Sequence, residues 1–192
     1  MRWHRVRCTF GWLFALAACS AAAPVPETLQ TLLGESPDGN EARLSVVGNR
    51  IVGAAVAITP AAMPKAARTM IEAIARDGDL LFSGREWGPR GAGFRVEKRY
   101  REGVLSVLVD ADGRVLERSH SVPIADVPQH VLAAALRVGP VIEEARSVSG
   151  TSREEYWSVL VRDRLGRSFV ARVGLEGTLI DSVRRVSARV DS

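Results

Sequence analysis

The sequence has few of the side chains that cross-link a domain or bind metal ions. Its 192 residues include two cysteines, Cys8 and Cys19, and three histidines. The region after Cys19 has no cysteine, so packing, hydrogen bonds and ion pairs rather than disulfides must hold it together. The two histidines of that region, His120 and His130, are isolated in the sequence, so we expect no metal site and no cofactor.

A strong excess of one charge is also missing. The whole chain has a net charge of +4, but three of its 26 Lys and Arg residues lie in the first nine positions, where no Asp or Glu occurs. The remainder is close to neutral, at about +1, and its charges of both signs are interspersed. Because nucleic-acid binding requires a cluster of basic residues, we expect no nucleic-acid partner.

The only long apolar run lies near the N-terminus and has the features of a secretory signal. Arg2, Arg5 and Arg7 form a basic flank, the apolar run covers 10–18, and small residues end it. The run is shorter than the roughly 20 apolar residues that span a bilayer. We therefore expect residues 1–18 to be a signal peptide that is removed on export.

The end of this run, Leu16-Ala17-Ala18-Cys19, resembles the lipobox of bacterial lipoproteins. The resemblance implies cleavage before Cys19 and acylation of its thiol, which would anchor the protein stably in a membrane. Ser20 follows, without the aspartate that favours inner-membrane retention, so we expect an outer-membrane anchor facing the periplasm. Residues 19–40 then form a tether. The alternative is an ordinary signal peptide with a coincidental cysteine.

The remainder of the chain contains a repeat with a 64-residue period. Ile51, Val115 and Leu179 each follow a turn within a pair of alternating apolar segments, and they are spaced by 64 residues. Pro64 and Pro128, which precede amphipathic segments, have the same spacing. The period predicts an α+β fold of two tandem units, each consisting of a helix and a four-stranded antiparallel meander.

Apolar residues at helical spacing predict helices from Pro64 to the glycine at 78 and over 128–138. An extra hairpin at 42–58 precedes them, so the two units would cover 41–123 and 124–192. Alternating segments predict strands at 80–87, 94–101, 105–109, 115–122, 141–148, 155–162, 168–173 and 178–186. The helix residues expected to be buried against the sheets are Met70, Ile74, Val131 and Val138.

The hairpin at 107–116, Val-Leu-Val-Asp-Ala-Asp-Gly-Arg-Val-Leu, together with the helix opened by proline, resembles the PepSY-like domains. These include the tandem β-lactamase-inhibitor-like form, and the resemblance covers about residues 60–190. It implies an exported, non-catalytic domain that binds or inhibits peptidases and other envelope enzymes. The family supplies no catalytic residues to transfer.

Three motifs suggest chemistry, and each has a simpler explanation. Asp110 and Asp112 could begin a calcium loop, but the position for its last ligand is a serine, and an Asp-Gly hairpin turn explains them. Ser119 and His120 point to opposite sides of a strand, so they cannot form a nucleophile–base pair. The Gly-rich segment 88–93 lacks the lysine of a phosphate-binding loop and is instead a flexible hairpin tip or contact loop.

The side chains that could bind a partner lie on strands. Arg95, Arg99 and Arg101 alternate with the set formed by Phe94, Val96, Lys98 and Tyr100, so we expect them on an open sheet face. Tyr156 and Trp157 are adjacent, and one of them would lie on such a face as an anchor. The sequence thus predicts a lipid-anchored binding or regulatory protein, not an enzyme, acting on an unidentified envelope protein such as a peptidase. A structural or assembly accessory lipoprotein is the alternative.

Overall fold

The computed structural model describes residues 41–89, 91–100, 103–151 and 154–189. The predicted signal peptide, Cys19, the tether and Arg101 lie outside the described residues. No helix among the residues that are described is long and apolar enough to cross a membrane.

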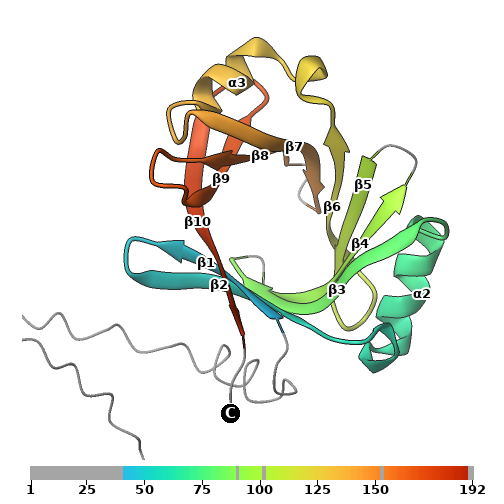
Figure 1. Ribbon diagram of the computed structural model, residues 1–192. Helices are drawn as coiled ribbons and strands as arrows, with labels where there is room; N and C mark the ends of the chain where they lie inside the picture. Colours follow the sequence, from blue (N-terminus) through green and yellow to red (C-terminus); the bar gives the residue numbers. More distant parts are fainter. Residues whose placement is uncertain (1–40, 90, 101–102, 152–153, 190–192) are drawn as a thin grey trace, which may run out of the picture.

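The described chain forms ten antiparallel strands that close into a barrel, seen as a ring in Figure 1. Each strand pairs with its sequence neighbours, and β1 pairs with β10 to close the ring. The strands are β1 (Glu41–Val47), β2 (Arg50–Ala57), β3 (Asp79–Gly88), β4 (Gly91–Tyr100), β5 (Gly103–Val109), β6 (Val115–Val122), β7 (Val141–Gly150), β8 (Glu155–Arg162), β9 (Ser168–Gly174) and β10 (Leu179–Arg189).

The predicted fold of two tandem α+β units was wrong. β6 pairs with β7 across the expected division, and β1 pairs with β10, so the strands form one closed sheet. Closure removes the unpaired edges that two separate meanders would expose. Helix α2 (Lys65–Ile74) and helix α3 (Gln129–Ala135) do begin 64 residues apart, but each occupies a connection of one barrel.

Both helices lie outside the barrel and cover part of its wall (Figure 1). Ala67 and Ile71 of α2 pack against Val96, Val107 and Val109 of β4 and β5. The second apolar cluster contains Val131, Ala134 and Ala135 of α3 together with Ala145, Val159, Val161, Ala171 and Val173 of β7, β8 and β9. Two of the three apolar clusters therefore lie between the helices and the outer wall of the barrel, and a third, smaller one is formed by Ala42, Ala54 and Val56 of β1 and β2.

The burial expected for the helices is confirmed only in part. Val131 is fully buried, and Ile74 and Val138 are partly buried against the two clusters. Met70 is 37% exposed, contrary to the prediction. The ten-residue α2 buries a narrow stripe formed by Ala67 and Ile71, and Met70 lies beside this stripe rather than within it.

Two hairpin tips lie directly against the starts of the helices. Gly113, with φ of +84°, would place an added Cβ only 2.8 Å from the carbonyl oxygen of Ala66. Gly177, with φ of +83°, would place one 3.0 Å from the carbonyl oxygen of His130. Glycine is required at both tips because the backbone is left-handed and the helix is in contact.

Candidate functional site

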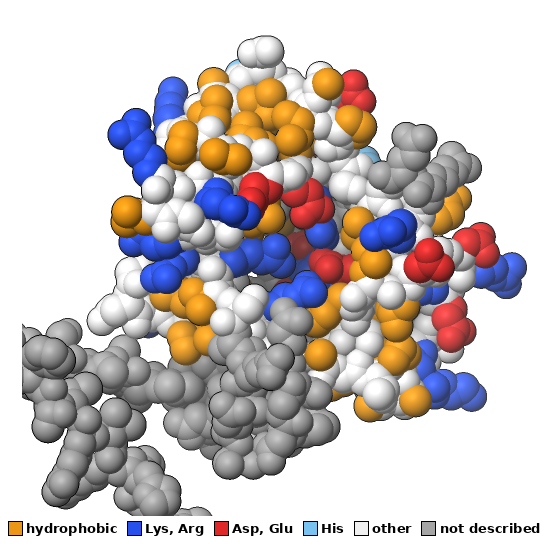
Figure 2. All heavy atoms as spheres, viewed as in Figure 1, with side chains coloured by type: hydrophobic (Ala, Val, Ile, Leu, Met, Phe, Trp, Pro, Cys, Tyr) orange, Lys and Arg blue, Asp and Glu red, His pale blue; other side chains and the backbone are white. Residues whose placement is uncertain are grey.

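The inside of the barrel holds charged side chains instead of an apolar core. Along β4, Val96 faces the helix-covered wall, whereas Arg95 and Glu97 face the lumen. The lumen contains a cavity of about 240 Å³, and Figure 2 shows a hollow within the ring with basic and acidic side chains around it. A ten-stranded barrel is wide enough to hold a small ligand besides its own side chains.

Arg95 lies in the lumen and not on an exposed sheet face. The alternation that grouped it with Glu97 was correct, but the sheet curls around this face and encloses it. Arg99, at the end of β4, is exposed. The expected open sheet face is thus an interior, and a role for these arginines in binding a partner stays a prediction.

The aromatic pair also divides between the two sides of the wall. Tyr156 is buried and faces the lumen, whereas Trp157 is partly buried and packs against the cluster beneath α3. Neighbouring residues of a strand point to opposite faces, as predicted. Neither aromatic is an exposed anchor, and their role in binding a partner also stays a prediction.

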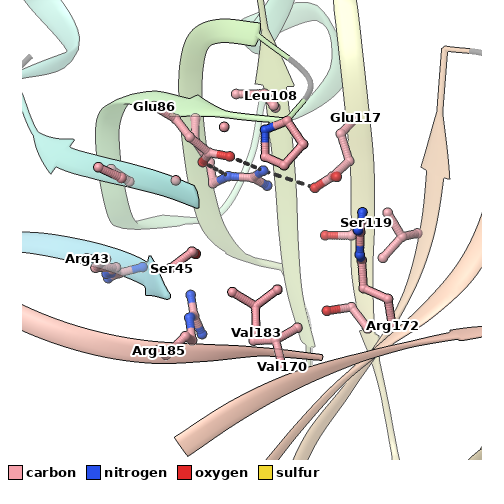
Figure 3. Close-up of a pocket in the computed structure, with 18 of the residues that line it drawn as sticks. Arg43, Ser45, Glu86, Leu108, Glu117, Ser119, Val170, Arg172, Val183 and Arg185 are labelled. Carbon is pink, nitrogen blue, oxygen red and sulfur yellow. Dashed lines mark hydrogen bonds and ion pairs between the residues drawn. The ribbon is translucent and has the colours of Figure 1, made fainter. Parts of the chain in front are cut away.

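Arg95 is the centre of one ion-pair network, whose carboxylates Glu86 and Glu117 are labelled in Figure 3. Its guanidinium bonds both oxygens of Glu86, donates to Glu117 Oε1 at 3.0 Å and donates to Ser106 Oγ at 2.8 Å. Tyr156 donates its hydroxyl to the other oxygen of Glu117 at 3.0 Å. Burial alone would lower the pKa of Arg95, but Glu86 and Glu117 outweigh it and raise the pKa well above its usual value.

Glu97 is the centre of a second network. Arg146 donates to its Oε1 at 2.9 Å and Arg43 to its Oε2 at 3.2 Å, so two cations share this carboxylate. Arg146 also donates to Glu144 at 2.6 Å. The guanidinium of Arg43 lies 3.9 Å from the ring centroid of Phe82, a cation–π contact that fixes its position.

The Glu97 network makes stability depend on acidic pH. Burial alone would raise the pKa of Glu97, but Arg146 and Arg43 outweigh it and lower the pKa below 4.5. A carboxylate with a lowered folded pKa stabilises the protein above its unfolded pKa, and this contribution is lost as pH falls through the folded value. We expect Glu97→Gln to be less stable than wild type at pH 7, with a difference that shrinks below about pH 4.5.

Denaturant unfolding at several pH values between 7 and 3 measures this difference. Glu176→Gln, in an exposed turn, is the control and should follow wild type throughout. A Glu97→Gln curve that stays parallel to wild type down to pH 3 would contradict the ion-pair assignment.

One wall of the cavity is apolar. Leu160, Val170 and Val183 are paired side by side across β8, β9 and β10 and line the cavity. Arg172 follows on this wall, and its Nε donates to Asp181 at 2.7 Å. Arg185 lies two residues beyond Val183 on β10, lines the cavity and is exposed beside it (Figure 3).

The sequence motifs that could suggest catalysis or metal binding do not come together in the described lumen. Ser119 lines the cavity, whereas His120 is exposed on the opposite side of β6, so they form no nucleophile–base pair. Outside the lumen, Asp110 accepts hydrogen bonds from the backbone of Asp112 and Arg114, which is the predicted turn. Within the described ranges, no three His, Cys, Asp or Glu side chains converge as a metal site requires.

Sequence reasoning missed most of the lumen. The residues that it did not select are Arg43, Glu86, Glu117, Glu144, Arg146, Arg172, Asp181 and Arg185. A signal for them was present, because several strands carry charges at alternate positions while the other positions are apolar. In β7, for example, Glu144 and Arg146 lie on either side of Ala145, which is buried.

The fold is similar to that of solved bacterial proteins, although no family model and no curated protein matches the sequence. A Bacteroides eggerthii structure described as "putative periplasmic proteins" matches at a TM-score of 0.50 and 9% identity, covering 64% of this chain and 88% of that one. A DUF2874 family protein from Bacteroides uniformis matches at 0.48 and 13%, covering 63% and 88%, and one from Bacteroides ovatus at 0.47 and 10%, covering 64% and 87%. None of these descriptions names a PepSY-like domain, so that resemblance stays a prediction. Over 64% of its length, the chain is therefore similar in fold to the Bacteroides eggerthii protein of that description.

Proposed function

We propose that this protein is an exported, lipid-anchored binding protein of the cell envelope, related to the PepSY-like domains and without catalytic activity of its own. The signal-like N-terminus and the lipobox at Cys19 support export and anchoring. The description of the Bacteroides eggerthii structure supports a periplasmic location. The outer membrane is the proposed site of the anchor because Ser20 follows Cys19.

The charged, hollow lumen is the observation that carries the binding function. Moving ion pairs out of water costs free energy, whereas packing apolar side chains does not. A charged interior is therefore not explained by the stability of the barrel alone. The cavity is lined by a few fixed polar groups and one apolar wall, which is the usual composition of a binding pocket. Arginines pair with the carboxylates of the lumen and hold them in fixed positions. Such fixed polar groups favour binding and orienting a ligand.

The anchor is tested at Cys19. We expect wild type to incorporate labelled palmitate and to fractionate with membranes, and Cys19→Ser to lose the label almost completely. The second cysteine of the chain gives a matched control, because Cys8→Ser lies in the predicted signal peptide and should leave labelling unchanged. An unmodified mature N-terminus beginning at Ser20 or Ala21, seen by mass spectrometry, would contradict lipidation.

Binding is tested by cross-linked capture from envelope extracts with the lipidated protein as bait. A stoichiometric peptidase or other hydrolase would support a regulatory role. Stoichiometric cell-wall or outer-membrane machinery would instead support the structural or assembly role. If neither a protein nor a small molecule is recovered in stoichiometric amount, the binding proposal fails.

A further inference from the structure

Arg185 differs from the other lumen arginines in its direct contacts with the described residues. Arg43 and Arg146 share Glu97, Arg95 holds Glu86 and Glu117, and Arg172 holds Asp181. Arg185 has neither a hydrogen bond nor a salt bridge to any residue that the structure describes. It therefore retains its capacity to bind an external anion.

Charges of both signs act on Arg185. Glu97 attracts it and is the largest single charge effect, Arg146 and Arg43 repel it, and Glu144 attracts it least. Desolvation and these two cations lower the pKa of Arg185, although an arginine remains charged at neutral pH. An anion beside Arg185 would relieve the repulsion, since it would also face Arg43 and Arg146.

The shape of the cavity restricts the rest of the ligand. The apolar wall of Leu160, Val170 and Val183 begins two residues from Arg185 on β10 and crosses to β9 and β8. A group resting on this wall would be removed from water, and burial of each of its methylenes would add to the affinity. The cavity of about 240 Å³ is smaller than most pockets for drug-sized ligands, so only a short apolar group fits.

We propose that the lumen binds a small carboxylate with a short apolar tail, with the carboxylate on Arg185 and the tail against Leu160, Val170 and Val183. Guanidinium groups match carboxylates geometrically because two parallel N–H donors meet two oxygens. The same chemistry could come from a free short-chain fatty acid or from the C-terminus of a peptide that ends in an apolar residue. This inference rests on the proposed binding function and names its ligand class.

Calorimetry on residues 20–192, a segment that contains every described residue, tests the inference. The protein is made without detergent, because detergents would compete for the apolar wall. The probes are hexanoate and N-acetyl-leucine, each compared with its neutral amide. We expect at least one acid to bind one-to-one and its amide to bind at least about tenfold more weakly, because the charge-assisted hydrogen bonds are lost.

Substitutions then locate the site. Arg185→Gln should weaken binding of the acid about tenfold or more, whereas Arg184→Gln, exposed on the other side of β10, should not. Binding by hexanoate alone would identify a free acid, and binding by N-acetyl-leucine alone would identify a peptide terminus. If Arg185→Gln fails to fold, the comparison of acid with amide on the unaltered chain still decides.

Three results would overturn the inference: no saturable binding of either acid, equal binding of acid and amide, or full affinity in a folded Arg185→Gln. Each of these would leave the broader binding proposal to the capture experiment. Conversely, recovery of no partner from the envelope, together with tight binding of an acid, would identify the small molecule as the sole ligand. The failures of the two proposals are therefore distinguishable.

Discussion

Replacing Arg95 by leucine is expected to destabilise the protein by about 3–5 kcal/mol, because it removes the cation that both Glu86 and Glu117 bind in the lumen. The Arg95 side chain is only 14% exposed, and those of Glu86 and Glu117 are 23% and 12% exposed. Water can therefore replace the lost ion pairs only in part. Equilibrium unfolding in denaturant at neutral pH measures the change.

Arg99 provides the matched control on the same strand. It lies four residues further along β4 and is exposed, so Arg99→Leu should change the free energy of unfolding by no more than about 0.5 kcal/mol. A second variant, Arg95→Lys, keeps the charge but cannot reproduce the bonds to Glu86, Glu117 and Ser106 together. If Arg95→Leu and Arg99→Leu are equally mild, Arg95 does not lie in an enclosed lumen.

Val131→Asp is expected to reduce stability by more than about 4 kcal/mol, because it buries an unpaired carboxylate between α3 and the barrel. Val131 is fully buried among Val159, Val161 and Val173. None of these neighbours can donate a hydrogen bond to the new side chain. Thermal and denaturant unfolding should therefore show either a large loss or no folded state at all.

Ala133→Asp tests the same helix on its exposed side. Aspartate has a lower helix propensity than alanine, so a loss of less than about 1 kcal/mol is expected. Similar losses at positions 131 and 133 would mean that α3 does not pack on the barrel in the described orientation.

Local features were the part of the fold that the sequence predicted well. Each predicted strand corresponds to an observed one, because alternation of apolar and polar residues reflects the backbone geometry of a strand directly. Helices α2 and α3 were located for the same reason, from apolar spacing after Pro64 and Pro128. The shared orientation of Arg95 and Glu97 also followed from alternation alone.

The closure of the sheet could not be predicted, because it depends on residues that are far apart in the sequence. Leu44 of β1 pairs with Val186 of β10, 142 positions later, and alternation contains no information on such partners. A charged strand face in an open sheet meets water, whereas in a barrel it meets other charged faces. The sequence therefore indicated which side chains share a face but could not show that Arg95 and Glu97 face an interior.

The candidate site depends on the same closure. Arg43 and Arg185 belong to β1 and β10, which are neighbours only because the ring is closed. In an open sheet these two strands would lie at opposite edges. Arg185 and Arg146 would then not line one cavity. Both the lumen and its proposed ligand therefore depend on the pairing of the first and last strands.

A disulfide between β1 and β10 tests this pairing most directly. Leu44 and Val186 are directly opposite one another, and the Cα separation of such a pair, about 4.5–5.5 Å, falls within the range that disulfides span. Residues 20–192 contain no cysteine, so a Leu44→Cys/Val186→Cys variant has only the two introduced thiols. Mild oxidation should link the two thiols quantitatively within one chain, which peptide mapping would show. The control variant Leu44→Cys/Ser149→Cys places its thiols on β1 and on β7, which do not pair, and it should stay reduced. If the first pair stays reduced as well, the barrel is not closed and the account of the lumen is wrong.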